Sequence, residues 1–350
     1  PNPNRSHMFV DLSLGINIII FLAAGAVVGV CGVWLTARAE QLAYITGLGQ
    51  AILGAVFLGI ITSLAGTITS VTSAWEGAAE LAFGNAIGGI AAQTTFLVIA
   101  DMLYRKANLE HAAASEENLM QGVLLVVMLS LPMLAMSGPG ITIWSIDILS
   151  FVILAAYLFG LRLLRQSHKM PMWSPKETSE TKPEQPSPPA ANMASAGLAL
   201  WLSFLFLALI VAVSGWLIAE SGIAITRYTG LSQTLFGTIF TAVVTSVPEL
   251  VIAIAAVRRG ALALAVGDII GGNTFDVLFL VLSDMAYRPG SIYQAVSGTL
   301  AFWMALNILL VGILLLGLLR RERHGLGNIG FEGVLVLLSY AVGVTVIFFH

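Results

Sequence analysis

Charge is scarce in this sequence. Asp, Glu, Lys and Arg make up 10% of its 350 residues, against about 25% in soluble domains. Hydrophobic residues make up 57%, and the mean hydropathy is +0.91. The formal net charge of -3, without a basic patch, excludes nucleic acid as a partner. The composition therefore predicts an integral membrane protein whose surroundings are the lipid bilayer.

Reactive groups are scarce as well. Cys31 is the one cysteine, which excludes an internal disulfide. The sequence has no HExxH motif, no phosphate-binding loop and no pairing of a nucleophile with a base, so neither an enzymatic activity nor a cofactor is expected. The histidines that fall in expected loops or at the terminus lack the spacing of metal ligands: His111, His168, His324 and His350.

Long apolar runs are what the sequence has in abundance. A membrane span needs about 20 apolar residues, and ten stretches qualify, which predicts an all-α protein. They cover about 13–36, 43–73, 77–103, 120–137, 142–164, 195–219, 231–257, 261–285, 297–319 and 331–349. The second and seventh stretches are overlong and interrupted by Gly, Ser, Thr or Pro, so broken or tilted helices are expected there.

The spans fall into two halves of five. Residues 166–193 are rich in Pro, Ser, Glu and Lys, which predicts a disordered linker. The first half is expected at 9–165 and the second at 194–350, and residues 1–8 are interpreted as a cloning scar that precedes Met8.

The distribution of Lys and Arg predicts the orientation. With the N-terminus outside, 13 of the 16 Lys and Arg residues fall in loops on the cytoplasmic side, as the positive-inside rule requires. Both termini are therefore expected outside, the linker is expected in the cytoplasm, and the protein is expected in the cell (inner) membrane.

An internal repeat is the most specific feature. A shift of 183 residues aligns Thr46–Arg105 with Thr229–Arg288 without a gap, and 23 of the 60 pairs are identical. The matches include ITSL with VTSV, GNAIGG with GDIIGG, and FLVIADMLYR with FLVLSDMAYR. Because each half has an odd number of spans, the second copy crosses the membrane in the opposite sense. An inverted repeat with interrupted helices is typical of transporters that bind their substrate at the midplane.

The segment TSVPEL in the seventh span carries both a proline and a charge. Pro248 removes a backbone hydrogen bond and frees carbonyl oxygens, and Glu249 adds a carboxylate at a depth where a charge costs about 2.5–3.5 kcal/mol on insertion scales. With the hydroxyls of Thr245 and Ser246 and with Asp268 in the next span, this predicts an all-oxygen site for a hard cation.

The first repeat contributes Thr62, Ser63 and Asn85 at the equivalent positions. The glycines of both motifs allow two backbones to approach closely, although helix packing alone is the alternative explanation for them. An isolated hydroxyl in a membrane helix also commonly bonds to its own backbone. A second layer around the ligands is expected to contain Asp276, its equivalent Gln93, Asn273 and Gly66.

The paired motifs resemble the alpha repeats of the sodium/calcium exchanger family, within the cation/calcium exchanger superfamily. The resemblance covers both halves and is closest in TSVPEL and GDIIGGNTFDVLF. It implies ten transmembrane helices in two inverted five-helix repeats and antiport of Ca²⁺ against Na⁺ by alternating access. It also implies that Thr245, Ser246, Glu249, Asp268, Thr62, Ser63 and Asn85 are ion ligands, with backbone carbonyls at Gly59 and Ala242.

The chain departs from the family pattern mainly in the first repeat. Ala65 and Gly66 stand where the second repeat has Pro248 and Glu249, so one carboxylate is missing. Two carboxylates neutralise one divalent ion or two monovalent ions, which argues against a cycle of three Na⁺ for one Ca²⁺. Proton coupling is therefore an alternative, and a diverged member that binds an ion as a sensor without exchanging it is another.

Overall fold

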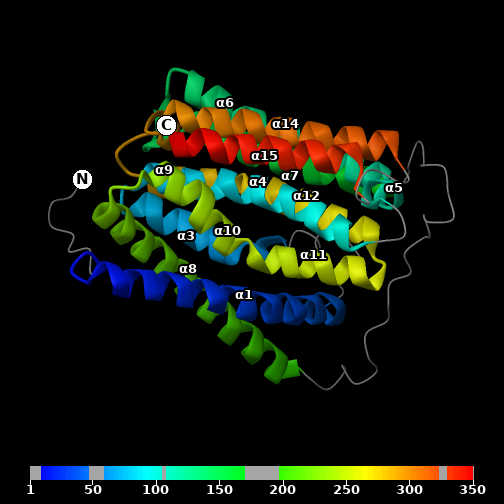
Figure 1. Cartoon of the computed structure of the whole chain (residues 1–350), viewed down its shortest axis with the longest axis horizontal. Helices are drawn as coiled ribbons and strands as arrows, with labels where there is room; N and C mark the ends of the chain where they lie inside the picture. The colour runs from blue at the N-terminus through cyan, green and yellow to red at the C-terminus, as the bar shows by residue number, and fades with distance from the viewer. Residues whose placement is uncertain (1–8, 47–58, 105–107, 170–196, 323–328, 350) are drawn as a thin grey trace.

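The computed structural model describes residues 9–46, 59–104, 108–169, 197–322 and 329–349 (Figure 1). The expected scar and most of the expected linker lie outside these residues. In chain order, the elements are α1 (Leu14–Ile45), α3 (Leu64–Trp75), α4 (Ala79–Leu103), α5 (Leu109–Ala113), α6 (Glu116–Ser137), β1 (Thr142–Ile143), β2 (Ile146–Asp147), α7 (Ile148–Lys169), α8 (Gly197–Thr229), α9 (Gln233–Leu235), the π-helix η3 (Phe236–Thr241), α10 (Ala242–Thr245), α11 (Val247–Arg259), α12 (Leu262–Asp276), α13 (Leu278–Ala286), the 3-10 helix η4 (Ile292–Gln294), α14 (Gly298–Arg320) and α15 (Phe331–Phe349).

The helices confirm an all-α membrane protein. Among the described residues, eight helices are long and apolar enough to cross a bilayer, and the bent pair 233–245 and 247–259 makes a ninth. The second expected span, 43–73, is described only in part. Helices α1 and α8 continue to Ile45 and Thr229 and pack against each other, so both are longer than the expected spans 13–36 and 195–219.

Two details differ from the expected spans. The fifth span was expected from residue 142, but Thr142–Ile143 pairs with Ile146–Asp147 in a small hairpin, and α7 begins only at Ile148. Apolar composition alone does not distinguish such a hairpin from the first turn of a helix. The eighth span is interrupted, since α12 ends at Asp276 and α13 begins at Leu278.

The helices lie in three layers (Figure 1). Helices α4 and α12 run through the middle, between a layer with α6, α7, α14 and α15 and a layer with α1, α3 and α8. In α4 the residues from Leu81 to Val98 are buried on every side, which small residues such as Ala and Gly allow. The GNAIGG motif of the first repeat therefore lies in the buried part of α4.

The break in the seventh span lies where the sequence predicts it. The N–H of Ser246 donates to the carbonyls of Ala242 and Val243, both at 3.2 Å, and α11 begins at Val247 with Pro248 in its first turn. The two parts meet at an angle of 44°. Helix α11 ends at Arg259 and is capped by Gly260, whose φ of 81° suits a residue without a side chain.

The ends of the repeats also match. Asp101 accepts a hydrogen bond from the N–H of Leu109 at 2.7 Å, and its equivalent Asp284 accepts one from Ile292 at 2.9 Å. Asp101 and Asp284 are 183 residues apart in the sequence, and so are their partners Leu109 and Ile292. The two aspartates therefore fix the turn that follows each central helix, and Asp147 caps α7 through the N–H of Leu149 at 2.9 Å.

Candidate ion-binding site

Three hydrogen bonds join the two repeats at the centre of the molecule. Ser63 Oγ donates to Asp276 Oδ1 at 2.6 Å, and Gln93 Nε2 donates to Ser246 Oγ at 3.3 Å. Ser63 is equivalent to Ser246, and Gln93 to Asp276. Gln93 Nε2 also donates to Asp276 Oδ2 at 2.7 Å, so two equivalent residues contact each other directly. That contact places the axis relating the two repeats between Gln93 and Asp276.

A small cavity of about 10 Å³ lies beside this contact. Its volume suits one water molecule or one bare ion. The hydroxyl, amide and carboxyl groups in its wall come from both repeats, and its lining residues are Ser63, Gly66, Asn85, Gly89, Gln93, Thr245, Ser246, Glu249, Asp276 and Phe279. Five of the predicted ligands therefore meet there: Ser63, Asn85, Thr245, Ser246 and Glu249.

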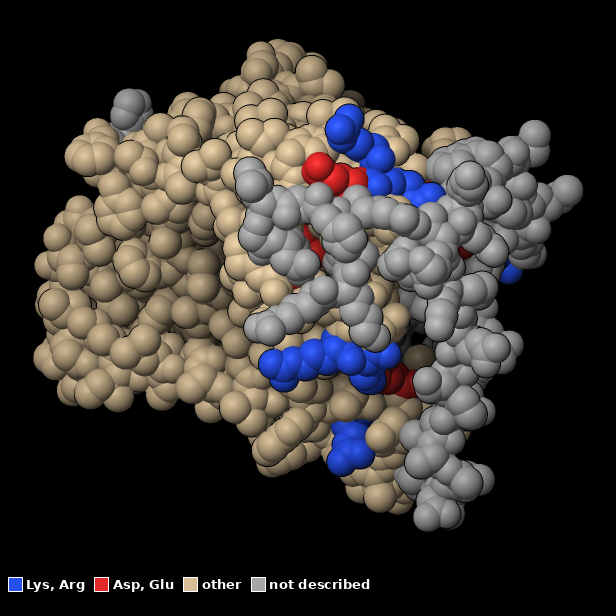
Figure 2. Space-filling model, turned by 45° about the vertical axis from the view of Figure 1, so that its right-hand side comes forward, with Lys and Arg blue, Asp and Glu red and all other residues tan. Residues whose placement is uncertain are grey.

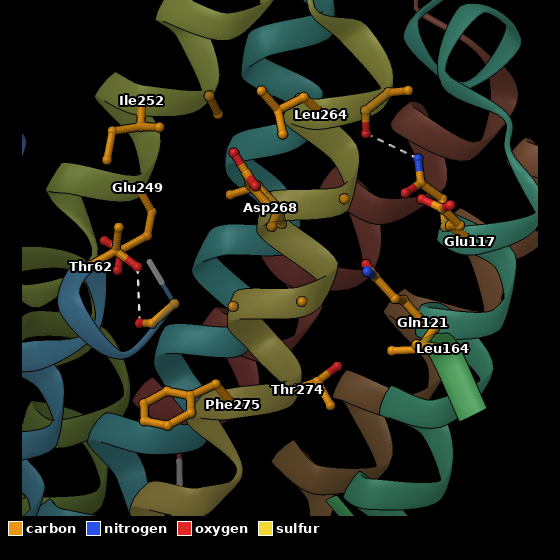
Figure 3. Close-up of a pocket in the computed structure, with 18 of the residues that line it drawn as sticks. Thr62, Glu117, Gln121, Leu164, Glu249, Ile252, Leu264, Asp268, Thr274 and Phe275 are labelled. Atoms are coloured by element: carbon orange, nitrogen blue, oxygen red, sulfur yellow. Dashed lines mark hydrogen bonds between the residues drawn. The ribbon is translucent and has the colours of Figure 1, made fainter. Parts of the chain in front are cut away.

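A larger cavity of about 350 Å³ adjoins Glu249 on its other side. Figure 3 shows Thr62 and Glu249 on one wall and Asp268 on the neighbouring helix α12. Gly59 lines the same cavity. From Glu249 the cavity extends past Gln121 toward Glu117 in the first turn of α6, at the end of the molecule where α5 lies (Figure 1).

Glu249 is the one predicted ligand that lines both cavities. Its side chain is 7% exposed, and its Oε2 atom has no hydrogen-bond partner among the described residues. A buried carboxylate oxygen without a donor is unfavourable unless a cation or a proton meets it. Glu249 therefore lies between the two cavities.

Asn85 and Asp268 are equivalent residues with different surroundings. Asn85 donates to the Gly66 carbonyl at 3.1 Å and to Ser70 Oγ at 2.9 Å, and its Oδ1 accepts from Thr245 Oγ1 at 3.3 Å. Asp268, by contrast, lines the large cavity. The first-repeat amide is thus buried, whereas the second-repeat carboxylate is exposed to the large cavity.

Some of the remaining predicted residues line the large cavity, and the others lie outside both cavities. Thr62 Oγ1 donates to the Gly59 carbonyl at 3.1 Å, so in this state it bonds to its own helix. The Ala242 carbonyl accepts from Thr245 Oγ1 at 3.3 Å, and Ala242 lines neither cavity. Asn273 donates to Thr94 at 3.1 Å and also lies outside both cavities. Within the described ranges, no three Asp, Glu, His or Cys side chains converge on a single metal position.

Asp276 lies closer to the centre than expected. The sequence places it in a second layer, but its carboxylate lines the small cavity directly. Sequence reasoning also missed the far wall of the large cavity, which includes Thr36, Glu40, Glu117 and Gln121. The signal for Glu40 and Glu117 is an acidic residue close to the end of an apolar run.

Close packing seals the end of the site opposite the large cavity. There α4 lies against η3, and a Cβ atom on Gly84 would lie 2.9 Å from Thr238 Oγ1, while one on Gly88 would overlap the Thr238 backbone. Thr234 Oγ1 donates to Glu80 Oε2 at 2.5 Å in the same contact. The equivalent of Gly88 is Gly271, which lines the large cavity and would place a Cβ 3.6 Å from Gln121 Oε1. The first repeat is therefore closely packed at Gly88, whereas the second repeat borders the large cavity at the equivalent Gly271.

Comparison with known proteins gives matches over both halves. The family model described as "Sodium/calcium exchanger protein" matches residues 16–164 and 198–349. The putative antiporter CaxA of Alkalimonas amylolytica is 27% identical over 304 residues, which covers 86% of this chain and 89% of that protein.

Two solved structures share the fold. The H⁺/Ca²⁺ exchanger CAX superposes with a TM-score of 0.71 at 15% identity, covering 95% of this chain and 84% of CAX. The sodium-calcium exchanger NCX_Mj superposes with a TM-score of 0.59 at 18% identity, covering 95% of this chain and 99% of NCX_Mj. At these identities the likeness concerns the fold.

Proposed function

The chain belongs to the sodium/calcium exchanger protein family, whose members are membrane antiporters and not enzymes, and from this premise we propose that it exchanges Ca²⁺ for Na⁺. Ions bind near the middle of the membrane, between the two repeats. The ligands come from Glu249 and Asp268 together with neutral oxygens of both repeats. The exchanger cycles between a state open to one side and a state open to the other.

Glu249 carries this proposal. It is buried, it has an oxygen without a partner in the described part of the chain, and it borders both cavities. Inside a membrane protein, such a carboxylate is typical of an ion pathway. Together with Asp268 in the large cavity it balances the charge of one Ca²⁺, and the space around them leaves room for the water that completes the coordination.

The unequal packing of Gly88 and Gly271 supports alternation between two states. Because the two halves are equivalent, α12 is expected to pack in the opposite state as closely as α4 packs against η3 here. Gly271 has no role in the open cavity that requires a glycine. It acquires one if α12 packs as closely in the opposite state as α4 does here.

The open cavity faces the cytoplasm in the proposed orientation. Figure 2 shows the basic side chains gathered at the end of the molecule that lies at the right of Figure 1. This end contains Arg258 and Arg259 at the close of α11, and the cavity reaches toward it at Glu117. Under the positive-inside rule it is the cytoplasmic end, so both termini lie outside.

A flux assay on reconstituted protein tests the proposal. Liposomes loaded with Na⁺ are diluted into Na⁺-free buffer containing ⁴⁵Ca²⁺, and the outward Na⁺ gradient is expected to drive Ca²⁺ uptake. Uptake that needs a proton gradient and ignores Na⁺ would contradict sodium coupling. Glu249 Oε2 has no hydrogen-bond partner among the described residues, and a proton on it would favour this second candidate, a cation/proton exchanger.

Absence of flux under both gradients would contradict antiport altogether. Ca²⁺-dependent thermal stabilisation in that case would identify the chain as a diverged ion-binding member. The missing carboxylate at Gly66 is what motivates this third outcome.

A further inference from the structure

The hairpin between α6 and α7 presents apolar side chains outward. Ile141 is 57% exposed, Ile143 is 47% exposed and Trp144 is 85% exposed, and these three residues form the apolar tip of the hairpin. Residues 118–161 contain one charged residue, Asp147, which is buried. Because α6 starts next to α5 and runs for 22 residues, the hairpin at its other end lies far from the basic end of the molecule. The apolar tip is therefore an exposed surface without a charge beside it.

The second repeat holds this hairpin in place. The N–H of Asp147 donates to Asp284 Oδ2 at 2.7 Å, and Ser291 Oγ donates to Asp147 Oδ2 at 2.7 Å. Gln294 Nε2 donates to the carbonyl of Ala135, just before the hairpin, at 2.7 Å. Asp284 belongs to α13, and the other two donors follow it in the chain. The hairpin is thus fixed to the end of α13, and its apolar tip has a defined position.

The turn at the tip has a conformation that its residues disfavour. Trp144 has a φ of 54° and Ser145 a φ of 65°, so both central residues are left-handed. Two-residue hairpin turns of this kind ordinarily contain Asn and Gly, for which a positive φ costs little. Backbone strain in folded proteins is concentrated at functional positions. The strained turn therefore marks the exposed Trp144 as a residue that makes an interaction.

The lipid-facing stripe of α7 is too short to cross a bilayer by itself. Its exposed apolar residues include Ile148, Phe151, Leu158 and Phe159, and the stripe ends at the exposed Arg162. At about 1.5 Å per residue, Ile148 and Arg162 lie about 21 Å apart along the helix axis, whereas the hydrocarbon core is about 30 Å thick. The long side chain of Arg162 reaches toward the headgroups and covers part of the difference at its own end. The rest of the missing apolar surface falls at the Ile148 end.

The apolar tip lies where that surface is missing. Strand β2 passes into α7 without an intervening residue, and Trp144 precedes Ile148 by four residues. At about 3.3 Å per residue, four residues of strand reach up to about 13 Å, which is more than the shortfall. The strands pair with each other, and the N–H of Ile148 donates to the Ile141 carbonyl at 3.0 Å. Paired backbone groups of this kind tolerate the edge of the hydrocarbon, and tryptophan is enriched at that depth.

We propose that the apolar tip is a membrane anchor, inserted between the lipid headgroups and acyl chains of the leaflet opposite the basic end. The surface is continuous with the lipid-facing stripe of α7, so its occupant is phospholipid and not a second copy of the chain. The loop at the equivalent place in the second repeat begins with Arg321, Glu322 and Arg323, so the anchor belongs to one leaflet. Through Asp284 the anchor sets the depth of α13 in the bilayer. This role is independent of the ions that the protein exchanges.

Depth-dependent quenching tests the anchor in full-length protein reconstituted in phosphatidylcholine liposomes. In a Cys31→Ser background, Trp144→Cys carries an NBD label, and nitroxide lipids quench either from near the headgroup or from the end of the acyl chain. The shallow nitroxide is expected to quench this label about twofold more than the deep one. Leu158→Cys, in the middle of the α7 stripe, is the control and is expected to show the reverse order. Iodide quenching at residue 144 as strong as that of NBD on free cysteine would place the tip in water and overturn the proposal.

The native side chain gives a second measurement. The chain has seven tryptophans, so the contribution of Trp144 is the difference in fluorescence between the wild type and Trp144→Phe. Lipids brominated near the headgroup are expected to quench this contribution more than lipids brominated at the chain end. Absence of quenching by either bromolipid overturns the proposal. Disulfide crosslinking of Trp144→Cys between two molecules would then identify a second copy of the chain as the occupant.

Bilayer thickness separates an anchor from residues that only stabilise the hairpin. The triple variant Ile141→Ser/Ile143→Ser/Trp144→Ser shortens the apolar surface, so its thermal stability is expected to be greatest in lipids with shorter acyl chains than those that suit the wild type. Thr142→Ser, at an exposed polar position of the same hairpin, is the control and is expected to keep the wild-type optimum. If the triple variant loses stability equally in short-chain and long-chain lipids, the three residues only stabilise the hairpin and the anchor is overturned.

Discussion

The two repeats place equivalent residues around one axis but divide the chemistry unequally. At three equivalent positions the second repeat has a carboxylate and the first does not. The pairs are Glu249 with Gly66, Asp268 with Asn85, and Asp276 with Gln93. The first repeat instead supplies neutral donors, as in the bonds from Ser63 and Gln93 to Asp276. In the proposed site, the negative charge therefore comes from the second repeat, and the neutral hydrogen-bonding groups come from both repeats.

The packing of the repeats is unequal as well. The first-repeat glycines Gly84 and Gly88 lie against the backbone of η3, whereas Gly271 borders open space. Similar sequences therefore adopt a closed and an open arrangement within one molecule. In the proposed exchange cycle, closure depends on glycine at this contact, and the carboxylates of the second repeat determine which ions bind.

The largest effect is expected from the carboxylate that borders both cavities. Glu249→Gln removes the charge from the ion pathway and is expected to lower exchange by about a hundredfold or more, or roughly 2.7 kcal/mol. The measurement is the initial rate of Na⁺-driven ⁴⁵Ca²⁺ uptake. Glu117→Gln is the control, because Glu117 lines the large cavity but not the small one, and its rate is expected to stay within about twofold of wild type. Similar losses in both variants would contradict a special role for Glu249.

Exchanging the acid and the amide separates the roles of Asp268 and Asn85. Asp268→Asn is expected to lower uptake by about tenfold or more because it removes one of the two charges proposed for Ca²⁺. Asn85→Asp loses the amide that donates to the Gly66 carbonyl, so it is expected to destabilise the fold by about 1–3 kcal/mol. Uptake rates and thermal unfolding of both variants are compared. If Asp268→Asn loses as much stability as Asn85→Asp, the proposal that Asp268 binds the ion whereas Asn85 stabilises the fold is wrong.

Replacing the equivalent glycines Gly88 and Gly271 with alanine tests whether the close contact of α4 with η3 keeps one end of the site closed. Gly88→Ala forces α4 away from η3, whereas Gly271→Ala fits the open cavity. In a Cys31→Ser background, Ser70→Cys reports on the closed end, because Ser70 is fully buried, and Thr62→Cys reports on the large cavity. Gly88→Ala is expected to make the Ser70→Cys probe react faster with a membrane-impermeant maleimide, and Gly271→Ala is expected to leave it protected. Equal protection in both variants would show that the glycine contact does not control closure.

The smallest effect concerns the turns that follow the central helices, where Glu110 is equivalent to Tyr293. Burial raises the pKa of Glu110 well above its usual value, and the charges of Asp101 and Glu332 raise it further. A raised pKa in the folded state means that stability is present at low pH and is lost as pH rises through that pKa. Glu110→Gln is therefore expected to be more stable than wild type at high pH, with the difference vanishing as pH falls below the usual glutamate range.

Tyr293→Phe is the control for that experiment. Burial raises the pKa of Tyr293 too, so the tyrosine stays protonated across the same interval and the variant is expected to show no pH-dependent difference. Thermal unfolding between pH 3.5 and pH 9 measures both variants, and this interval includes the usual glutamate pKa of about 4.3. Parallel stability profiles for Glu110→Gln and wild type would show that the proton on Glu110 does not stabilise this turn.

Much of this arrangement follows from the sequence for physical reasons. The constant offset of 183 residues predicts that equivalent residues share an environment, and the contacts of Asp101 and Asp284 agree. Pro248 predicts the break before α11, since a proline removes one backbone donor. Spacing along one chain does not report distance across an axis, so the direct contact of Gln93 with Asp276 was not predictable. A Cβ atom on Gly66 would lie 2.8 Å from Phe279 Cε2. This filling of the Gly66 position depends on packing between helices and was missed for the same reason.

The central claim is that carboxylates of the second repeat, with Glu249 between the two cavities, bind the transported ions. Anomalous scattering from crystals soaked in Sr²⁺, as a substitute for Ca²⁺, tests it most directly. A peak bound by both Glu249 and Asp268 in the large cavity is the predicted result. A structure with Sr²⁺ bound elsewhere and no peak at Glu249 would contradict the account.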